Sequence, residues 1–339
     1  MLTSADVKKA AREFGADLCG IASMDRFEGA PKQQDPRYIF PDAKACIVLA
    51  FRIPRGYFRG IEEGTYFGAY ASMGYGSLNQ VYMPIVLRDL CCFIEDYGFE
   101  GAPVPNIYSG SSVSFVTQKH TPERSRAVRP DLPNPDILVD MRIAAFAAGL
   151  GEIGYSKMLL TPEFGPAQRI VALLTDAPLE PDPLFSGKIC DRCLRCATEC
   201  SGKAICATQT ESITVAGRKI EWGKLDVIKC SVAYRGGDPQ YNPFLQPTVK
   251  EEDYKDQYSG GQALDKAITY GHDYGHKPAL EGARGCIRAC LAHLEETGKL
   301  TKKFENRFRR GKPWRLASYD AGPERQAPAP GVAALTNVE

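Results

Sequence analysis

The 339-residue sequence lacks the features that would place it in a membrane or mark it as a general binder of nucleic acids. Its longest apolar run, around Ala45–Phe51, is far shorter than the roughly 20 residues that a membrane helix needs. The opening Met1–Asp6 has neither the basic nor the apolar region of a signal peptide. An excess of one charge is also missing, because 42 basic side chains face 41 acidic ones. We therefore expect a cytoplasmic protein with no membrane partner.

Cysteine, by contrast, is abundant, with twelve residues in the chain. Disulfides are rare in the cytoplasm, so metal binding is the leading explanation for so many thiols. Four of the cysteines lie in strand or helix patterns and are expected in the core: Cys19, Cys46, Cys91 and Cys92. The other eight lie in the second half of the chain.

The segment from Cys190 to Cys200 has the spacing C-x2-C-x2-C-x3-C. This spacing lets one loop wrap three thiolates around a [4Fe–4S] cluster, while the fourth cysteine usually serves a second cluster. A zinc site would normally show two separated C-x2-C pairs. Serine replaces the proline that usually follows the fourth cysteine. The spacing predicts an iron–sulfur protein.

Later cysteines must supply the remaining ligands of two [4Fe–4S] clusters. The cross-over rule assigns the first cluster to Cys190, Cys193, Cys196 and Cys290. It assigns the second to Cys200, Cys230, Cys286 and Cys206. Ala283 occupies the position where a C-x2-C pair with Cys286 would need a cysteine. The second ligand set therefore lacks one cysteine of the usual motif. The alternative is that Cys206 is a small buried hydrophobic residue and the second cluster has three irons.

The glycines of Gly149-Leu150-Gly151-Glu152-Ile153-Gly154 match the dinucleotide fingerprint G-x-G-x-x-G. That fingerprint requires a preceding strand, whereas residues 140–148 have a helical pattern. We expect these glycines to end a helix and to allow tight backbone packing.

Residues 1–180 predict an α/β layer architecture. Helices are expected over 4–14 and 78–97, and strands over 17–22, 45–53 and 170–175. Gly60–Gly76, rich in glycine and tyrosine, predicts a loop that could cover a ligand. Near residue 185 the hydrophobic periodicity weakens, as expected where metal supplies stability.

The residues that lead into the cysteine motif resemble a known family. They are the stretches 148–154, 159–166 (LLTPEFGP) and 174–182 (LTDAPLEPD). The block 148–206 closely resembles the shared region of cobalamin-dependent reductive dehalogenases and epoxyqueuosine reductases, and a more diffuse likeness covers about residues 5–295. The resemblance implies a nitroreductase-like α/β domain over 1–185 that holds a base-off corrinoid. A ferredoxin-like domain with two [4Fe–4S] clusters would follow over 186–300, then a basic-aromatic extension and disordered tail over 301–339.

The function implied by the resemblance is reductive cleavage of a carbon–heteroatom bond, an epoxide or a halide, through Co(I). The substrate would be a small molecule or borne on tRNA, and the electrons would come from a low-potential donor such as ferredoxin or flavodoxin. None of the four histidines lies in an Asp-x-His-x-x-Gly motif, so a histidine-ligated corrinoid is not indicated. Residues expected at the corrinoid are Gly149, Gly151, Gly154, Arg142, Leu160 and Thr161, although Arg142 equally fits a surface charge on a helix.

The resemblance also implies a proton donor beside the corrinoid. Counting back from the glycine run places the family's aspartate at Pro135, next to Asp136. Asp140 is the other candidate, and it equally fits a helix cap. Dehalogenases of the family use a tyrosine instead. Tyr108 is then a candidate beside Tyr66, Tyr70 and Tyr75, for each of which packing is the simpler explanation.

Two alternatives remain open from the sequence. Residues 302–315 alternate basic and aromatic side chains and could form an RNA surface, or the aromatics could pack on the body while the charges stay solvated. The whole chain could also be a ferredoxin-like electron-transfer or corrinoid-activating protein without its own substrate.

Overall fold

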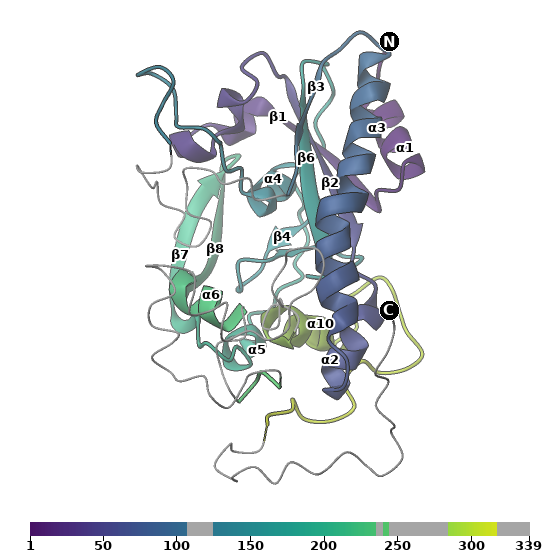
Figure 1. Ribbon diagram of the computed structural model, residues 1–339, viewed down its shortest axis with the longest axis vertical. Coiled ribbons are helices and arrows are strands. Elements are labelled where there is room, and N and C mark those ends of the chain that lie inside the picture. The colour runs from purple at the N-terminus through teal and green to yellow at the C-terminus, as the bar shows by residue number, and fades with distance from the viewer. Residues whose placement is uncertain (107–124, 235–239, 244–283, 317–339) are drawn as a thin grey trace, which may run out of the picture.

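A four-stranded sheet forms the centre of the computed structural model, which describes residues 1–106, 125–234, 240–243 and 284–316 (Figure 1). The strand order is β1-β2-β6-β3, and every neighbouring pair is antiparallel. The strands are β1 (Leu18–Ser23), β2 (Ala45–Arg52), β3 (Gly101–Val104) and β6 (Gln168–Thr175). The strands expected over 17–22, 45–53 and 170–175 are therefore confirmed.

Helices cover both faces of this sheet (Figure 1). On one face lie α1 (Ser4–Glu13) and α3 (Met83–Glu95), packed on Ile47 and Leu49 of β2. On the other lies α4 (Met141–Ala147), packed on Cys46 and Val48. Because successive side chains of a strand point to opposite faces, a strand covered on both sides must be apolar throughout. The layered mixture of helix and sheet expected from the sequence is confirmed.

Helix α1 begins at the expected place. Thr3 caps it, and the side chains of Thr3 and Asp6 satisfy each other's backbone N–H groups in a capping box. The chain leaves the helix at Gly15, whose φ of +116° suits glycine.

Most of the segment Gly60–Gly76 is helical and only residues 64–67 are not, so the prediction of a loop over the whole segment is wrong. Helix α2 (Arg59–Glu63) is followed by a π-helical segment, η5 (Ala69–Tyr82), which runs directly into α3. A Cβ at Gly74 would lie 3.1 Å from Ile53 and 3.2 Å from Tyr57, so the missing side chain lets η5 approach the sheet. Glycine here serves close packing rather than a turn.

The second half of the chain adds further strands and helices below and beside the sheet (Figure 1). Strands β4 (Glu152–Ile153) and β5 (Leu159–Leu160) pair with each other, as do β7 (Ile205–Val215) and β8 (Arg218–Leu225). The β7–β8 turn uses Ala216 and Gly217, both with positive φ, as a two-residue hairpin turn requires. The helices are α5 (Arg195–Thr198), α6 (Val227–Tyr234) and α10 (Cys286–Glu296). Short 3-10 turns are η1 (Met24–Phe27), η2 (Lys32–Gln34), η3 (Pro36–Tyr38) and η4 (Arg55–Phe58).

A shared core joins the two halves of the chain. Ile53, Phe58 and Tyr70 belong to the same buried cluster as Ile287 and Leu291 of α10. The division at residue 185 and the nitroreductase-like and ferredoxin-like assignments stay predictions.

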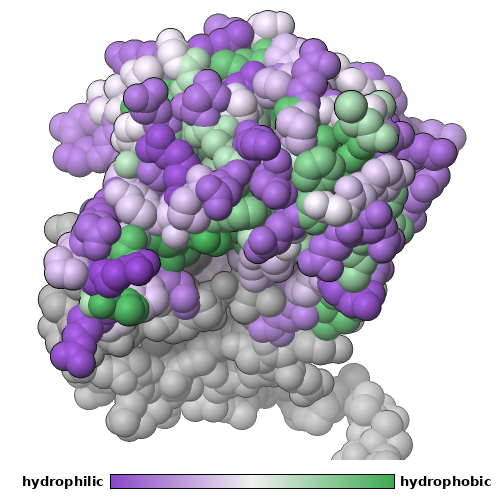
Figure 2. Space-filling view, turned by 90° about the horizontal axis from the view of Figure 1, so that it is seen from above, coloured by the Kyte–Doolittle hydropathy of each residue, from purple (hydrophilic) through white to green (hydrophobic). Residues whose placement is uncertain are grey.

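The surface at the upper end of the molecule is mainly hydrophilic, with apolar side chains gathered in a hollow between the polar ones (Figure 2). Within the described ranges, no helix combines the length and the apolar character that crossing a bilayer would need.

Removing Leu90 should test the α3–sheet core. Its side chain has no exposed surface, whereas Ile85 on the same helix is 53% exposed. We expect Leu90→Ala to lower the free energy of unfolding by about 2–5 kcal/mol, because it leaves a cavity. Ile85→Ala should cost far less. Urea unfolding measures both, and equal losses would contradict this packing.

Candidate functional site

Four cysteines from two distant segments line one cavity. Cys190, Cys193 and Cys196 come from the motif loop, and Cys290 comes from α10. The fourth cysteine of the motif, Cys200, is not among the residues that line this cavity. The structure therefore brings together the set that the cross-over rule assigns to the first cluster.

Three side-chain interactions hold the end of α10, and Lys299 just after it, against the motif loop. His293 Nε2 lies 2.8 Å from an Asp191 carboxylate oxygen, and Lys299 Nζ lies 3.1 Å from the same oxygen. At the end of the helix, Arg195 and Glu296 form an ion pair at 2.6 Å. Cys290 is thereby kept opposite the three loop cysteines.

The loop itself is shaped by backbone contacts. Arg192 and Leu194 adopt left-handed conformations, with φ of 58° and 60°, so the chain curls on both sides of Cys193. The carboxylate of Glu152 accepts the backbone N–H of Ile189 at 2.7 Å and also that of Cys190. These contacts fix where the loop begins to wrap.

The donor set fits an iron–sulfur cluster. Burial raises the pKa of Cys196 to about 12, and the neighbouring Cys190 and Cys193 add to the effect. The pKa of Cys290 is raised in the same way, first by burial and then by the three loop thiols. Four thiolates this close together would repel one another unless a bound cation compensated their charge. Three cysteines from one tight loop, with a fourth from elsewhere, are the ligand arrangement of a [4Fe–4S] cluster.

Residues close in sequence to Cys200, Cys230 and Cys286, three cysteines of the second predicted set, also contact one another. Cys200 is buried, and the following Gly202 packs against Lys229 and Ala233 of α6, which carries Cys230. Arg284, two residues before Cys286, donates to the Glu199 carbonyl at 2.9 Å. The assignment of Cys200, Cys230 and Cys286 to one cluster stays a prediction that this placement supports.

Cys206 lies on β7 and is partly exposed, so the alternative that it is a buried hydrophobic residue is not what the structure shows. Its sulfur lies 3.5 Å from the Thr208 hydroxyl, and its carbonyl accepts the Tyr155 hydroxyl at 2.8 Å. Its role as the fourth ligand stays a prediction.

The glycine run packs tightly, as expected from the helical pattern before it. Helix α4 ends at Ala147, and Gly149 follows with φ of +76°. A Cβ at Gly149 would lie 2.2 Å from the Pro183 carbonyl oxygen, and one at Gly151 would lie 2.0 Å from the Leu160 carbonyl oxygen. The space beside these glycines is filled by the chain itself.

The other residues predicted to contact the corrinoid also interact with parts of the chain itself. Gly154 and Leu160 line the cysteine cavity. Thr161 is fully buried, and its hydroxyl accepts the Phe164 N–H at 3.2 Å, which closes a turn. The described contacts of these residues do not form a corrinoid pocket.

Asp140 caps α4, as the second interpretation of this residue predicted. Its carboxylate accepts the Arg142 backbone N–H at 3.1 Å and lies 3.3 Å from the Arg142 side chain and 3.9 Å from Lys157. Burial raises the pKa of Asp140, but the charges of Arg142 and Lys157 and the hydrogen bonds from Arg142 outweigh it, so the pKa is lowered. Such a carboxyl is ionised at neutral pH and is a poor proton donor. Arg142, predicted to contact the cofactor, instead hydrogen-bonds and pairs with the Asp140 carboxylate.

The remaining proton-donor candidates are scattered. Asp136 is exposed, and its carbonyl accepts the Gln33 side chain at 3.2 Å. Tyr108 lies outside the described residues. Tyr66 is 62% exposed, whereas Tyr70 is buried with its hydroxyl 3.1 Å from Arg169. The Arg169 guanidinium also lies over the Tyr75 ring, 4.1 Å from its centroid.

The basic-aromatic segment packs on the body of the protein. Phe308 is buried, and Trp314 Nε1 donates to the Ile61 carbonyl at 2.6 Å. Arg309 pairs with Glu62 at 2.9 Å and with Glu199 at 2.8 Å. The packing alternative therefore describes this segment better than an RNA surface built from its aromatics.

Sequence reasoning missed the residues that assemble the cavity. Ligand atoms of Asp191, Cys193 and His293 lie within 4.8 Å of one another, yet Asp191 and His293 are 102 positions apart. Their only local signal is proximity to a cysteine, since Asp191 follows Cys190 and His293 lies three residues after Cys290. Glu152 sits inside the glycine run and gave no signal of its contact with the loop.

Sequence comparison confirms the predicted relationship to reductive dehalogenases. No family model matches the chain. A tetrachloroethene reductive dehalogenase of Dehalobacter restrictus is 44% identical over 220 residues, covering 59% of this chain and 38% of the relative. The chain spans less than half the length of the curated relatives it matches.

Two solved structures are also similar. One is a reductive dehalogenase whose structure suggests a mechanism for B12-dependent dehalogenation, with a TM-score of 0.48 at 19% identity, covering 76% of this chain and 34% of that one. The other is an epoxyqueuosine reductase with an epoxyqueuosine-modified tRNA stem loop, with a TM-score of 0.46 at 15% identity, covering 87% and 82%.

Asp140→Asn should destabilise the protein in a pH-dependent way. Asparagine keeps a capping oxygen but loses the charge that faces Arg142 and Lys157. The pKa is lowered in the folded state, so this stabilisation is present above the ordinary value of 3.8 and is lost as pH falls through the folded value. We expect a loss of about 1 kcal/mol at pH 7 that shrinks below about pH 4. Urea unfolding at both pH values, with exposed Asp42→Asn as control, measures it; a pH-independent loss would be inconsistent.

Cys290→Ala should remove the first cluster selectively. The variant leaves three thiols in the cavity, so about four of about eight reconstituted irons should be lost or become labile. The matched control is Cys92→Ala, which should keep the full complement, because Cys92 is exposed and the prediction that it lies in the core is wrong. Anaerobic iron and sulfide analysis with electron paramagnetic resonance measures the result. Unchanged iron in Cys290→Ala would remove this cysteine from the ligand set.

Proposed function

We propose that the chain is an iron–sulfur and corrinoid-dependent reductase that cleaves a carbon–heteroatom bond, because it is related to the reductive dehalogenases. The observation that carries the proposal is the meeting of Cys190, Cys193, Cys196 and Cys290 in one cavity. Thiolates at this spacing hold a low-potential [4Fe–4S] cluster, whose chemistry is one-electron transfer. Reductive cleavage of a bond needs two such electrons, which a pair of clusters can relay.

The chain's own residues would hold and insulate this relay. Cys193 is exposed at the edge of the cavity, whereas Cys196 is buried, so electrons would enter from the Cys193 side. The Tyr155 N–H donates to Cys190 Sγ at 3.4 Å, which would stabilise the thiolate. Leu160 and Leu294 line the same cavity and would keep water from it.

The substrate would carry an epoxide or a carbon–halogen bond. A corrinoid, if bound, would supply low-potential cobalt chemistry for reducing such a bond. The dehalogenase relatives are named for tetrachloroethene, and the epoxyqueuosine reductase neighbour was solved with a modified tRNA stem loop. We propose Asp136 or Tyr108 as the proton donor, because Asp140 is engaged as an ionised helix cap.

One observation favours a second candidate function, an electron-transfer or corrinoid-activating protein without its own substrate. The glycines expected at the corrinoid pack against Pro183 and Leu160 of the same chain, while the first-cluster edge is exposed at Cys193. That combination suits a carrier that passes electrons to another protein.

Metal analysis and turnover separate the two candidates. After anaerobic reconstitution with iron, sulfide and cobalamin, the reductase should hold about eight irons and about one cobalt. It should then convert either epoxyqueuosine-containing tRNA or a halogenated phenol when supplied with a strong reductant. Eight irons with no cobalt and no turnover would exclude the reductase and leave the carrier. Iron-free protein would exclude both.

A further inference from the structure

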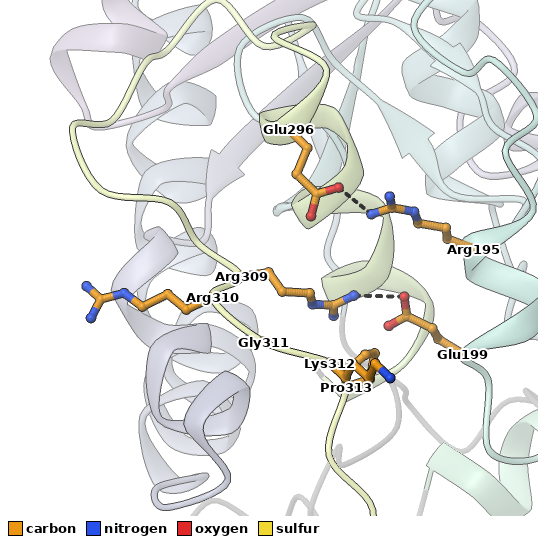
Figure 3. Close-up of a pocket in the computed structure, with 8 residues that line it drawn as sticks. All are labelled: Arg195, Glu199, Glu296, Arg309, Arg310, Gly311, Lys312 and Pro313. Atoms are coloured by element: carbon orange, nitrogen blue, oxygen red, sulfur yellow. Dashed lines mark hydrogen bonds and ion pairs between the residues drawn. The ribbon is translucent and has the colours of Figure 1, made fainter.

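We propose that an open pocket beside the first cluster is the docking surface for an acidic, low-potential electron-donor protein. The pocket is lined by Arg195, Glu199, Glu296, Arg309, Arg310, Gly311, Lys312 and Pro313 (Figure 3). The inference rests on the proposed function, since it assigns the entry point of the electrons that the clusters would relay.

The pocket has an excess of positive charge. Its two carboxylates are each engaged by an arginine, Glu296 by Arg195 at 2.6 Å and Glu199 by Arg309 at 2.8 Å (Figure 3). Arg310 points away from both glutamates in Figure 3. In the part of the chain that the structure describes, no ion pair joins Arg310 or Lys312 to a carboxylate, and both are exposed. Their charges are therefore available to a partner.

The pocket adjoins the ligands of the first cluster. Arg195 lies in the motif loop directly before Cys196, and Glu296 is the last residue of α10, the helix that carries Cys290. Cys193, also in this loop, is exposed. A protein seated on the pocket would contact the segments that hold the cluster, which is the placement that electron transfer between proteins requires.

The segment that presents these charges is anchored on both sides. Arg309 is held by Glu62 and Glu199, and Trp314 is fixed by its hydrogen bond to Ile61 and its edge contact with Phe67. Arg310–Pro313 therefore spans two fixed points. A preformed surface binds its partner with a smaller entropic cost than a flexible tail does.

An acidic protein fits this pocket better than RNA does. Recognition of single-stranded RNA uses exposed aromatic side chains on which bases stack. The pocket lining contains no aromatic residue, and the nearby aromatics are engaged: Phe308 is buried, Trp314 packs on Phe67, and the 48% exposed Phe304 lies against the Arg55 guanidinium. What remains is charge, which steers an oppositely charged protein and speeds its association.

The step at this surface is a single electron transfer. A reduced donor, such as a flavodoxin hydroquinone, loses one electron and becomes the semiquinone, while the [4Fe–4S]²⁺ cluster gains it and becomes [4Fe–4S]⁺. No bond to carbon is made or broken at this point. The donor is supplied by the proposal as a low-potential redox protein with an acidic face.

Charge reversal at the two unpaired residues tests the proposal. The variant R310E/K312E and a control variant K9E/R88E carry the same change in net charge, and Lys9 and Arg88 are exposed on α1 and α3. Stopped-flow absorbance measures cluster reduction by flavodoxin hydroquinone over a range of salt concentrations. Dithionite, a small reductant that needs no docking surface, is the parallel donor.

We expect R310E/K312E to lower the second-order rate constant about tenfold at low salt, with the deficit disappearing at high salt. The control variant should lose much less, and dithionite should reduce all three proteins alike. An equal effect in both variants would overturn the proposal. So would an unchanged flavodoxin rate together with weakened binding of a tRNA stem loop, which would make the pocket an RNA surface. Bleaching by dithionite shows that the clusters are present, so its absence would instead sink the proposed function.

Discussion

The closure of α10 onto the motif loop is the constraint on which the rest of this structure depends. A cluster ligand set drawn from residues about a hundred positions apart exists only if Cys290 is held opposite Cys190–Cys196. The Asp191–His293 contact at 2.8 Å and the Arg195–Glu296 pair at 2.6 Å supply that hold. Each is modest alone, and together they fix the last turn of the helix, which follows Cys290.

The sheet contributes by giving this closure a rigid support. Phe58 and Tyr70, next to the sheet, share a buried core with Ile287 and Leu291 of α10. Arg288, with no exposed surface, reaches across this core to Glu62 at 3.1 Å. Because a buried charge is costly without a partner, Arg288 requires Glu62, which also pairs with Arg309, and this contact ties α2 to the cysteine-bearing helix.

The sequence predicted well whatever is encoded locally. The apolar runs of β2 and β6, the cap of α1 and the helix before the glycine run all follow from short-range patterns. The π-helical η5 was missed, because glycine and tyrosine suggest a loop until Gly74 is seen packed on Ile53. The spacing of the motif, with the cross-over rule, predicted the set of cysteines in the first cavity. It could not predict Glu152 or His293, whose roles depend on partners 38 and 102 positions away.

A helix-covered sheet thus supports a cavity lined by four cysteines, of which Cys193 is exposed. Anomalous diffraction at the iron edge, from crystals grown anaerobically after reconstitution, is the most direct test of cluster binding in this cavity. We predict two separate iron peaks, one of them surrounded by Cys190, Cys193, Cys196 and Cys290. A single mononuclear metal in that cavity, or a first cluster ligated by Cys200 in place of Cys290, would contradict it.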